Sequence, residues 1–434
     1  MNKYEAAVDE LIQTRPAFSQ MAPACQTEAI QINDFIYMSQ GTSNAYMVVT
    51  DAGRVIINTG MGFEALTHKK LFDAVCPGPT PYLLLTQGHV DHVGGVAQFR
   101  EEATQLVAQS NLSACQRDDE RITTVRQGQS YIWFKKTIDK AIAVARHHPE
   151  VFVQDTPVAD IIYHENYKFN LGGIDFELIS TPGGETMDSA IVWLPQYKIL
   201  FSGNLTGPLF PHFPNFNTIR GDRYRFIEPY LTSISKARSL GASTLITGHF
   251  EPVEGAQLIA DSFARLHAAV DYVHSTTLQR MNEGTDIYTL MDEVTLPIAI
   301  SVGEGYGKVS WAVRTIWESY LGWFKADKTS ELYATQVESI YPDLVELAGL
   351  DAVIDRARQK LQKSQPEAAM LLAEAVLAAA PDEPAAVNLA IDVITALRER
   401  AAYGNFWEDG WLRSRVDLLR QRLDRLVLDN GTRN

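Results

Sequence analysis

The chain has 434 residues, 46% hydrophobic and 21% charged, which describes a globular protein with more than one domain and excludes a disordered chain. Its 38 basic and 53 acidic residues give a net charge of −15, which disfavours nucleic acid as a partner. No apolar run approaches the roughly 20 residues that span a bilayer, no signal peptide is evident, and Cys25, Cys76 and Cys115 are scattered, so we expect a cytoplasmic protein without membrane contact or disulfides.

The first half of the chain is predicted to alternate strands and helices. Residues 45–49 and 54–57 are typical of two strands joined by a turn at 50–53. A helix is expected at 64–75. Further strands fit 82–85, 106–108, 176–179, 189–193, 199–201 and 245–246, whereas residues 111–170 give the least clear pattern. Several of these strands end in Gly or polar residues, so we expect a site in the loops at one edge of a sheet.

The loop after the strand at 82–85 carries Gln87, His89, Asp91 and His92 and ends in two glycines. Two histidines and a carboxylate in one short loop are costly to desolvate unless a cation lies between them. Imidazole and carboxylate ligands suit zinc, and also iron or manganese. A polar turn with unrelated histidines is the alternative.

This loop resembles the His-x-His-x-Asp-His motif of the metallo-β-lactamase superfamily, with Gln87 at its first position. Three later strand ends, at 181–185, 202–204 and 247–249, agree with the order of ligand loops in that superfamily. The resemblance implies an αββα sandwich, two mixed sheets face to face with helices outside both. It assigns Glu185 to one metal position, Asn204 to the place of a bridging acid and His249 to a second metal position.

Glu185 lies in a Thr-Pro-Gly-x-Glu turn that resembles the alkylsulfatase branch, where most other relatives have His. Residues 218–221, Thr-Ile-Arg-Gly, resemble a Thr-Leu-Arg-Gly segment whose arginine contacts the sulfate group in that branch. The resemblance therefore gives Arg220 the role of holding an anionic head. A surface arginine in a basic cluster with Arg223 and Arg225 is the alternative.

The C-terminal part supports the same branch. Residues 320–324, Tyr-Leu-Gly-Trp-Phe, resemble the alkylsulfatase dimerisation segment, so a homodimer is expected. From residue 350 the pattern is helical, and Pro381 to Pro384 separates a helix ending near 379 from one at 385–397, a pair that resembles a tetratricopeptide hairpin. We expect a hydrolase domain at 1–275 and an α-helical dimerisation domain at 276–434.

The departures from the motif limit the expected metal content. One position would hold Gln87, His89 and Glu185, and the other Asp91, His92 and His249. Amides are weak ligands for zinc, so we expect one tight ion at the second position and a weak or absent ion at the first. Asn58, where many relatives have an acid bracing the metal loop, is a further departure.

The implied function is hydrolysis of a sulfate ester, or a similar anionic ester, by a metal-activated water. Asp91 would orient that water or take its proton, and Arg220 would hold a small substrate with an anionic head and an apolar tail. Two aromatic groups could line an apolar pocket or be core, namely Phe210, Phe213 and Phe216 and also Tyr131, Trp133 and Phe134. His212 is either a compensating ligand or a loop histidine. A hydrolase of another ester, lactone or thioester and a non-catalytic dimeric binding protein remain open.

Overall fold

The computed structural model describes residues 3–151, 153–217, 219–223, 225–402 and 404–431. The chain forms two compact units, Met1–Tyr320 and Leu321–Asn434. The domain boundary predicted after residue 275 falls within helix α8 (Ala256–Asn282), whereas the compact units divide after Tyr320. Thr218, the first residue of the segment expected to bind an anion, lies outside the described residues.

The first sheet has seven strands whose order in space is their order in the chain. They are β1 (Ile30–Gln31), β2 (Ile36–Ser39), β3 (Ala45–Thr50), β4 (Gly53–Ile57), β5 (Tyr82–Leu84), β6 (Gln105–Gln109) and β7 (Ile161–Tyr163). β1 to β4 pair antiparallel, and β4 to β7 pair parallel. The predicted hairpin is confirmed, because β3 and β4 pair with Thr50 opposite Gly53.

The second sheet has six strands in the order β13-β12-β11-β10-β9-β8. They are β8 (Asn166–Leu171), β9 (Ile174–Ser180), β10 (Ala190–Leu194), β11 (Ile199–Gly203), β12 (Thr244–Thr247) and β13 (Val253–Glu254). Only β11 and β12 pair parallel among these described strands, and helix α7 (Ile227–Ser239) connects them.

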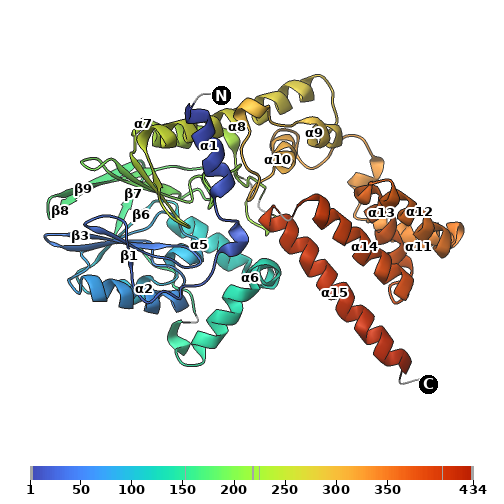
Figure 1. The fold of residues 1–434 in the computed structure, drawn as a ribbon, viewed down its shortest axis with the longest axis horizontal. Coiled ribbons are helices and arrows are strands. Elements are labelled where there is room, and N and C mark those ends of the chain that lie inside the picture. Colours follow the sequence, from blue (N-terminus) through green and yellow to red (C-terminus); the bar gives the residue numbers. More distant parts are fainter. Residues whose placement is uncertain (1–2, 152, 218, 224, 403, 432–434) are drawn as a thin grey trace. The chain divides into compact units, whose positions relative to one another are not determined.

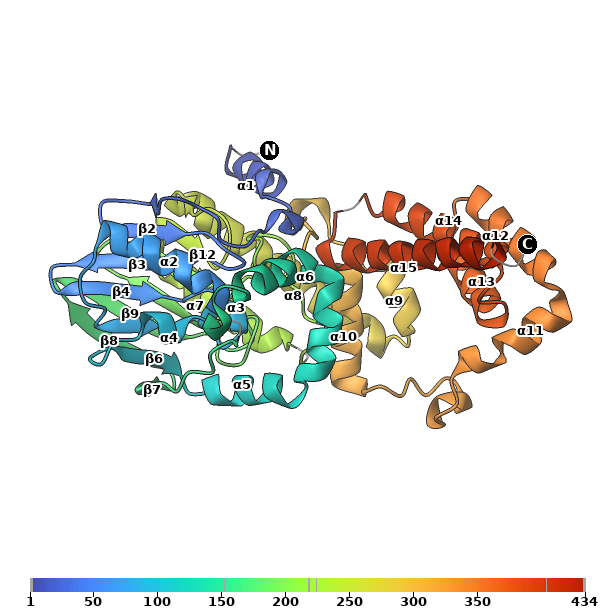
Figure 2. The same ribbon diagram turned by 90° about the horizontal axis from the view of Figure 1, so that it is seen from below.

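Three apolar clusters define the layers of the first unit. Between the sheets, Val48 and Ile57 of the first sheet pack with Val192 and Phe201 of the second. The outer face of the first sheet packs on α2 (Gly62–Val75) and the short α4 (Val96–Phe99), and the outer face of the second packs on α7 and α8. Figure 1 shows this order of helix, sheet, sheet, helix, which is the αββα sandwich expected from the sequence, and Figure 2 looks onto the first sheet from the side of α2.

The least clear part of the sequence folds into two helices and two strands. Helix α5 (Leu112–Arg121) and helix α6 (Thr123–Ala145) precede a single turn at Pro149–Val151, and β7 and β8 follow. Helix α6 is bent at Phe134, whose backbone is not helical. Residues of α5, among them Cys115 and Asp118, line the cavity described below.

The remaining elements of the first unit are helical. They are α1 (Lys3–Thr14), η1 (Phe18–Gln20), α3 (Val90–Val93), α9 (Ile287–Glu293), η3 (Ile298–Ile300) and α10 (Val309–Leu321). Helices α8, α9 and α10 share one apolar cluster with the outer face of the second sheet.

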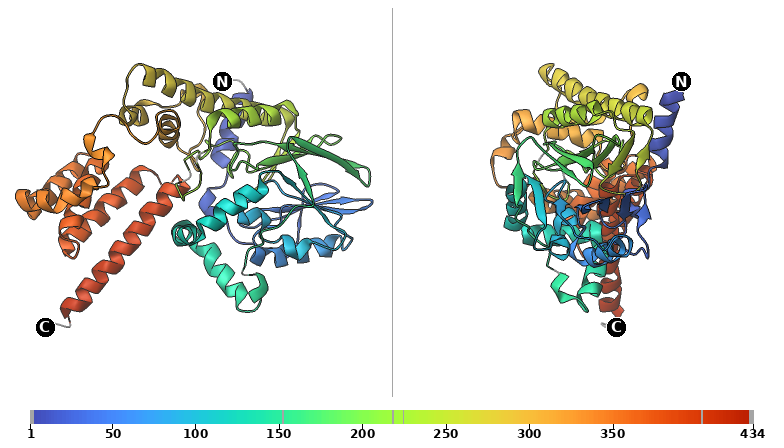
Figure 3. Two further views of the ribbon diagram at one scale, coloured as in Figure 1. Left: turned by 180° about the vertical axis from the view of Figure 1, so that it is seen from behind. Right: turned by 90° about the vertical axis from the view of Figure 1, so that its left-hand side faces the viewer.

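The second unit is made of helices. They are η4 (Thr329–Leu332), η5 (Val337–Ile340), α11 (Tyr341–Ala348), α12 (Leu350–Gln362), α13 (Pro366–Ala379), α14 (Pro384–Arg400) and α15 (Phe406–Gly431), and Figure 3 shows α12 to α14 folding back on one another. Small side chains such as Ala369, Ala373 and Ala390 are fully buried between them, which lets the helices approach closely. The single helix expected to end near 379 is two helices, because Ser364 adopts a positive φ of 55° and Pro366 starts α13.

No helix among the described residues is both long and apolar enough to cross a bilayer. Cys25, Cys76 and Cys115 are all free thiols.

Candidate metal centre and adjoining cavity

The metal-binding loop predicted after β5 is held by a dense set of hydrogen bonds. Asn58 has a positive φ of 57°, and its side-chain oxygen accepts from the Thr86 backbone N–H at 3.0 Å. Its amide nitrogen donates to Thr86 Oγ1 at 2.9 Å. The carbonyl of His92 accepts from the backbone N–H of Thr59 at 2.8 Å. Asn58 therefore braces the loop without the acid that relatives carry there.

Three of the predicted ligands come together at the strand ends. Asp91 and His92 lie in α3, at the end of the first sheet, and His249 follows β12 of the second. One ligand atom from each lies within 4.8 Å of the other two, and this is the only such group found among the described residues. The second metal position expected from the sequence is thus a real cluster that joins the two sheets.

The chemistry of this cluster suits a divalent cation. Neither ring nitrogen of His92, nor Nδ1 of His249, has a hydrogen-bond partner among the described residues. Burial lowers the pKa of His92 to about 4 and lowers that of His249, so both rings are neutral near pH 7. Burial alone would raise the pKa of Asp91, but His92 and His249 hold it below its ordinary value. Two neutral imidazoles whose ring nitrogens lack hydrogen-bond partners, together with one carboxylate, form a suitable ligand set for a divalent metal ion.

The residues predicted for the first metal position lie close together, but neighbouring side chains contact them. His89 Nδ1 lies 3.1 Å from Gln87 Nε2 and 3.7 Å from Glu185 Oε2. On the opposite side of the ring, His89 Nε2 lies 3.3 Å from Asp222 Oδ2. Burial alone would lower the pKa of His89, but the flanking Asp222 and Glu185 carboxylates raise it above its ordinary value. His89 is thus enclosed by the Gln87 amide and two carboxylates.

Asn204 connects the two positions through hydrogen bonds. Its amide nitrogen lies 2.8 Å from Glu185 Oε2 and 3.2 Å from His249 Nε2. An aspartate here would face both positions with acceptor oxygens, whereas this amide offers N–H donors. The place of the bridging acid is thus filled by a neutral donor.

Glu185 is buried and fully engaged. Its Oε1 accepts from the Tyr306 hydroxyl at 2.7 Å and from Arg225 Nη1 at 3.4 Å. Burial alone would raise the pKa of Glu185, but Arg225 and His89 hold it well below its ordinary value. Glu185 is therefore ionised, and Arg225 already neutralises it without a metal. The residues present do not fit an ion at the first position as well as they do at the second.

Sequence reasoning missed Asp222 as a site residue, although it stands in the predicted anion-binding loop. Arg220, with its side chain 27% exposed, points Nη2 toward Asp222 Oδ2 at 3.9 Å. Tyr306 was missed as well, and Arg225 was considered only as part of a basic cluster. The one available signal for Asp222 was an isolated acid placed among three arginines.

A cavity of about 220 Å³ opens beside the first position. Its polar end is formed by His89, Glu185, Asp222 and Arg225. The rest of its wall includes apolar side chains, of which Met187 and Phe226 are about half exposed at 49% and 52%. Its exposed lining therefore mixes these apolar side chains with charged ones such as Asp118 and Arg223.

The other sequence candidates have structural roles. Phe210, Phe213 and Phe216 are buried in the core beneath α7 and α8, as the core alternative expected. Trp133 is also buried, whereas Tyr131 is 48% exposed. His212 Nε2 lies 3.0 Å from the Ile12 carbonyl, and its Nδ1 accepts from the Gly305 N–H at 3.1 Å, so backbone groups occupy both ring nitrogens.

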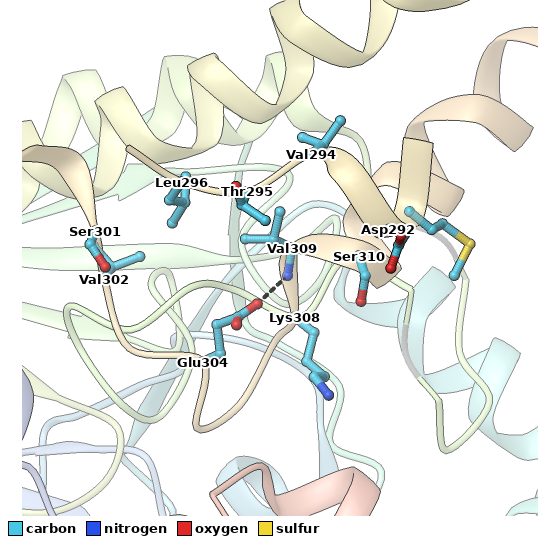
Figure 4. A pocket seen from close by; sticks show the side chains of 11 residues that line it. Asp292, Val294, Thr295, Leu296, Ser301, Val302, Glu304, Lys308, Val309 and Ser310 are labelled. Atoms are coloured by element: carbon cyan, nitrogen blue, oxygen red, sulfur yellow. Dashed lines mark hydrogen bonds between the residues drawn. The ribbon is translucent and has the colours of Figure 1, made fainter. Parts of the chain in front are cut away.

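A larger cavity, about 290 Å³, lies between α9 and the start of α10 (Figure 4). The Glu304 carboxylate at its side accepts from the Val309 backbone N–H at 2.5 Å, and Figure 4 shows that this carboxylate turns toward the helix start. Glu304 thus caps α10, and this cavity holds none of the predicted ligands.

The N-terminal segment covers one side of the metal cluster. The ring of Phe18 lies edge-on to His249 at 5.6 Å and to Tyr306 at 5.2 Å, and Phe18 is itself buried. Farther along, the Ala24 backbone N–H donates to the buried Glu64 carboxylate at 2.9 Å.

An αββα sandwich with an Asp-His-His cluster at the strand ends of both sheets defines a metallo-hydrolase fold. In agreement, residues 38–249 match the metallo-beta-lactamase superfamily, and residues 290–414 match the alkyl sulfatase dimerisation family. The chain therefore combines a metallo-β-lactamase domain with an alkylsulfatase dimerisation region, which places it in the alkylsulfatase-like branch. Membership of this superfamily implies divalent metal binding.

Relatives and solved structures match this chain over most of its length. The chain is 24% identical to a linear primary-alkylsulfatase of a Pseudomonas species over 403 residues, which cover 86% of this chain and 73% of that protein. It is 24% identical to an alkyl/aryl-sulfatase of Saccharomyces cerevisiae over 416 residues, covering 89% of this chain and 63% of that one. The structure of a stereoselective inverting sec-alkylsulfatase from Pseudomonas matches with a TM-score of 0.78 at 17% identity, covering 96% of this chain and 78% of that one. The fold of this chain is thus shared with that enzyme.

Proposed function

We propose that this chain is a metal-dependent hydrolase that cleaves sulfate esters of amphiphilic alcohols. The observation that carries the proposal is the buried Asp91, His92 and His249 cluster with its orphaned ring nitrogens. The adjoining cavity supports the substrate class, because its lining combines cationic groups such as Arg225 with the apolar Met187 and Phe226. The alkylsulfatase relatives agree with this assignment.

The metal would be zinc, held tightly at Asp91, His92 and His249, with iron or manganese as weaker fits to the same ligands. A second ion at Gln87, His89 and Glu185 would be weak or absent, because N–H donors engage these residues. When bound, the ion supplies a Lewis acid and activates water for attack. Asp91 would accept the proton of the attacking water, and Arg220 would hold the anionic head.

Metal content per chain tests the centre directly. We expect about one zinc ion per chain in the wild type and none in His249→Ala, as measured by plasma mass spectrometry after dialysis. His148→Ala is a matched control, because His148 is half exposed with its side chain 52% accessible. Two tightly held ions in the wild type would contradict the single-ion proposal, and no ion after zinc loading would favour a non-catalytic binding protein.

Release of sulfate from medium-chain alkyl sulfates tests the reaction. We expect turnover by the zinc-loaded protein, and Arg220→Ala should raise KM by about tenfold or more, since charge-assisted hydrogen bonds contribute about 1.5–3 kcal/mol. Arg238→Ala is the matched control, because Arg238 is an exposed arginine of α7 that does not line the cavity. Turnover of lactones or thioesters without any sulfate release would favour the second candidate function.

The dimerisation region leads us to propose a homodimer. Trp323, Tyr333 and Leu347 in this region are 65%, 66% and 86% exposed in the single chain. Apolar side chains of this size are costly to leave in water, so a second copy is expected to cover them. Sedimentation equilibrium should give twice the chain mass, and Leu347→Glu should shift the equilibrium toward single chains.

A further inference from the structure

One carboxylate in the cavity is surrounded by four cationic or donor side chains. Asp222 Oδ1 lies 2.9 Å from Arg126 Nη2, and Oδ2 lies 3.3 Å from His89 Nε2. Arg220 Nη2 and Arg225 Nη2 also approach Oδ2, at 3.9 and 4.0 Å. These partners come from α6, the metal loop and the segment 219–225, so the convergence is made by the tertiary fold.

The Asp222 carboxylate occupies the place that an anionic ligand would take. It lines the charged end of the 220 Å³ cavity, and its side chain is only 16% exposed. The Asp222 carboxylate faces three guanidinium groups, those of Arg126, Arg220 and Arg225, and a carboxylate in such surroundings keeps its negative charge. Arg220 and Arg225 both lie within 4.0 Å of Asp222 Oδ2, and Arg225 also faces Glu185 Oε1 at 3.4 Å.

A sulfate group and a carboxylate satisfy arginine in the same way, by presenting oxygens to a planar fork of N–H donors. Two anions cannot share that place cheaply, because like charges within a few ångströms repel strongly where water is scarce. If Arg220 holds the anionic head, as the proposed function requires, Asp222 lies where that head would go.

We propose that Asp222 is an internal anion that fills the anion-binding place beside the metal centre and competes with the anionic head of the substrate. Binding of substrate then requires the Asp222 carboxylate to leave Arg220 and Arg225. Asp222 thereby lowers the affinity of the site for every anionic head by a similar factor, so that only ligands whose apolar tail adds affinity are held tightly.

Arg126 gives the displaced carboxylate a partner. It binds Asp222 through Oδ1, the oxygen that faces away from Arg220 and Arg225, and it also pairs with Asp119 of α5. A rotation that keeps the Arg126 contact and breaks the contacts of Oδ2 frees the two arginines without leaving Asp222 as an unpaired charge. The helix pair α5 and α6 therefore stabilises both states of the loop.

Inorganic sulfate is the probe that tests this competition, because it has no tail and need not be hydrolysed. Sulfate affinity is measured by calorimetry on the zinc-loaded full chain. We expect Asp222→Asn to bind sulfate at least about tenfold more tightly than the wild type, which corresponds to about 1.4 kcal/mol. Asp222→Ala should do the same, so the conclusion does not depend on the fold tolerating one particular replacement.

Asp139→Asn is the matched control, since it removes the same charge from the exposed face of α6, where Asp139 pairs with Lys135. It should leave sulfate affinity unchanged. Equal or weaker sulfate binding by both Asp222 variants, with thermal unfolding like that of the wild type, would overturn the proposal. This outcome is separate from a failure of the proposed function, which is absence of sulfate release from esters by the wild type and the variants alike.

Discussion

Replacement of Arg225 by Met removes the cation that faces Glu185 and is the most direct test of how the first metal position is stabilised. Both side chains are nearly inaccessible, at 7% for Arg225 and 4% for Glu185, and their atoms lie 3.4 Å apart. Breaking such a buried pair costs about 3–5 kcal/mol, because the remaining charge has lost its partner without regaining water. Tyr306 and Asn204 still donate to Glu185, so we expect a loss near the lower end of that range, about 3 kcal/mol.

The assay is hydrogen exchange of the amides of β9 and β11 in increasing denaturant, with metal removed, which reports on the first unit alone. Arg225→Met combined with Glu185→Gln should recover most of the loss, because no charge is then left unpaired. A loss below about 1 kcal/mol in Arg225→Met would match an exposed ion pair and refute the reasoning.

Two further predictions concern groups packed around the centre. Burial raises the pKa of Glu64 from 4.5 to about 7. The folded chain therefore holds the proton of the Glu64 carboxyl group more tightly than the unfolded chain does. As a result, the free energy of unfolding falls as the pH rises between these two values. Glu64→Gln should remove up to about 3 kcal/mol of that fall, and parallel stability curves for the two proteins across this pH range would contradict the argument. A Cβ at position 248 would lie 2.1 Å from Asn204 Oδ1 and 3.1 Å from His92 Cε1, so Gly248→Ala should weaken zinc binding by about tenfold or more, as measured by chelator competition. Gly78→Ala, whose added Cβ meets nothing closer than 3.5 Å, should bind zinc as the wild type does.

The sequence predicted the strands and the metal-binding loop because both signals are local. The β3 and β4 hairpin follows from apolar runs with a turn between them, and the loop from Gln87 to His92 follows a buried strand. The pairing of Asp91 and His92 with His249 was available only through the resemblance to a superfamily, since no local pattern connects the two segments.

The missed features depend on contacts between distant residues or on unusual backbone. Asp222 gains its role from Arg126 and His89, neither of which is close to it in sequence. The break between α12 and α13 lies at Ser364, a residue type that seldom marks a positive φ. Helices α5 and α6 were also not predicted from the sequence, because much of both helices is exposed and their apolar pattern is weak.

The segment from Phe18 to Ala24 has a consequence for the strength of the metal centre. Phe18 rests against His249, and Ala24 is tied to Glu64, so this strip of chain keeps solvent from one side of the cluster. Where solvent is excluded the local dielectric is low, and the attraction between the Asp91 carboxylate and a cation is correspondingly greater. Proteolytic cleavage of this strip would leave every ligand and both sheets in place and would still lower the affinity for the metal ion. The metal affinity of the centre is therefore set partly by residues that do not contact the metal.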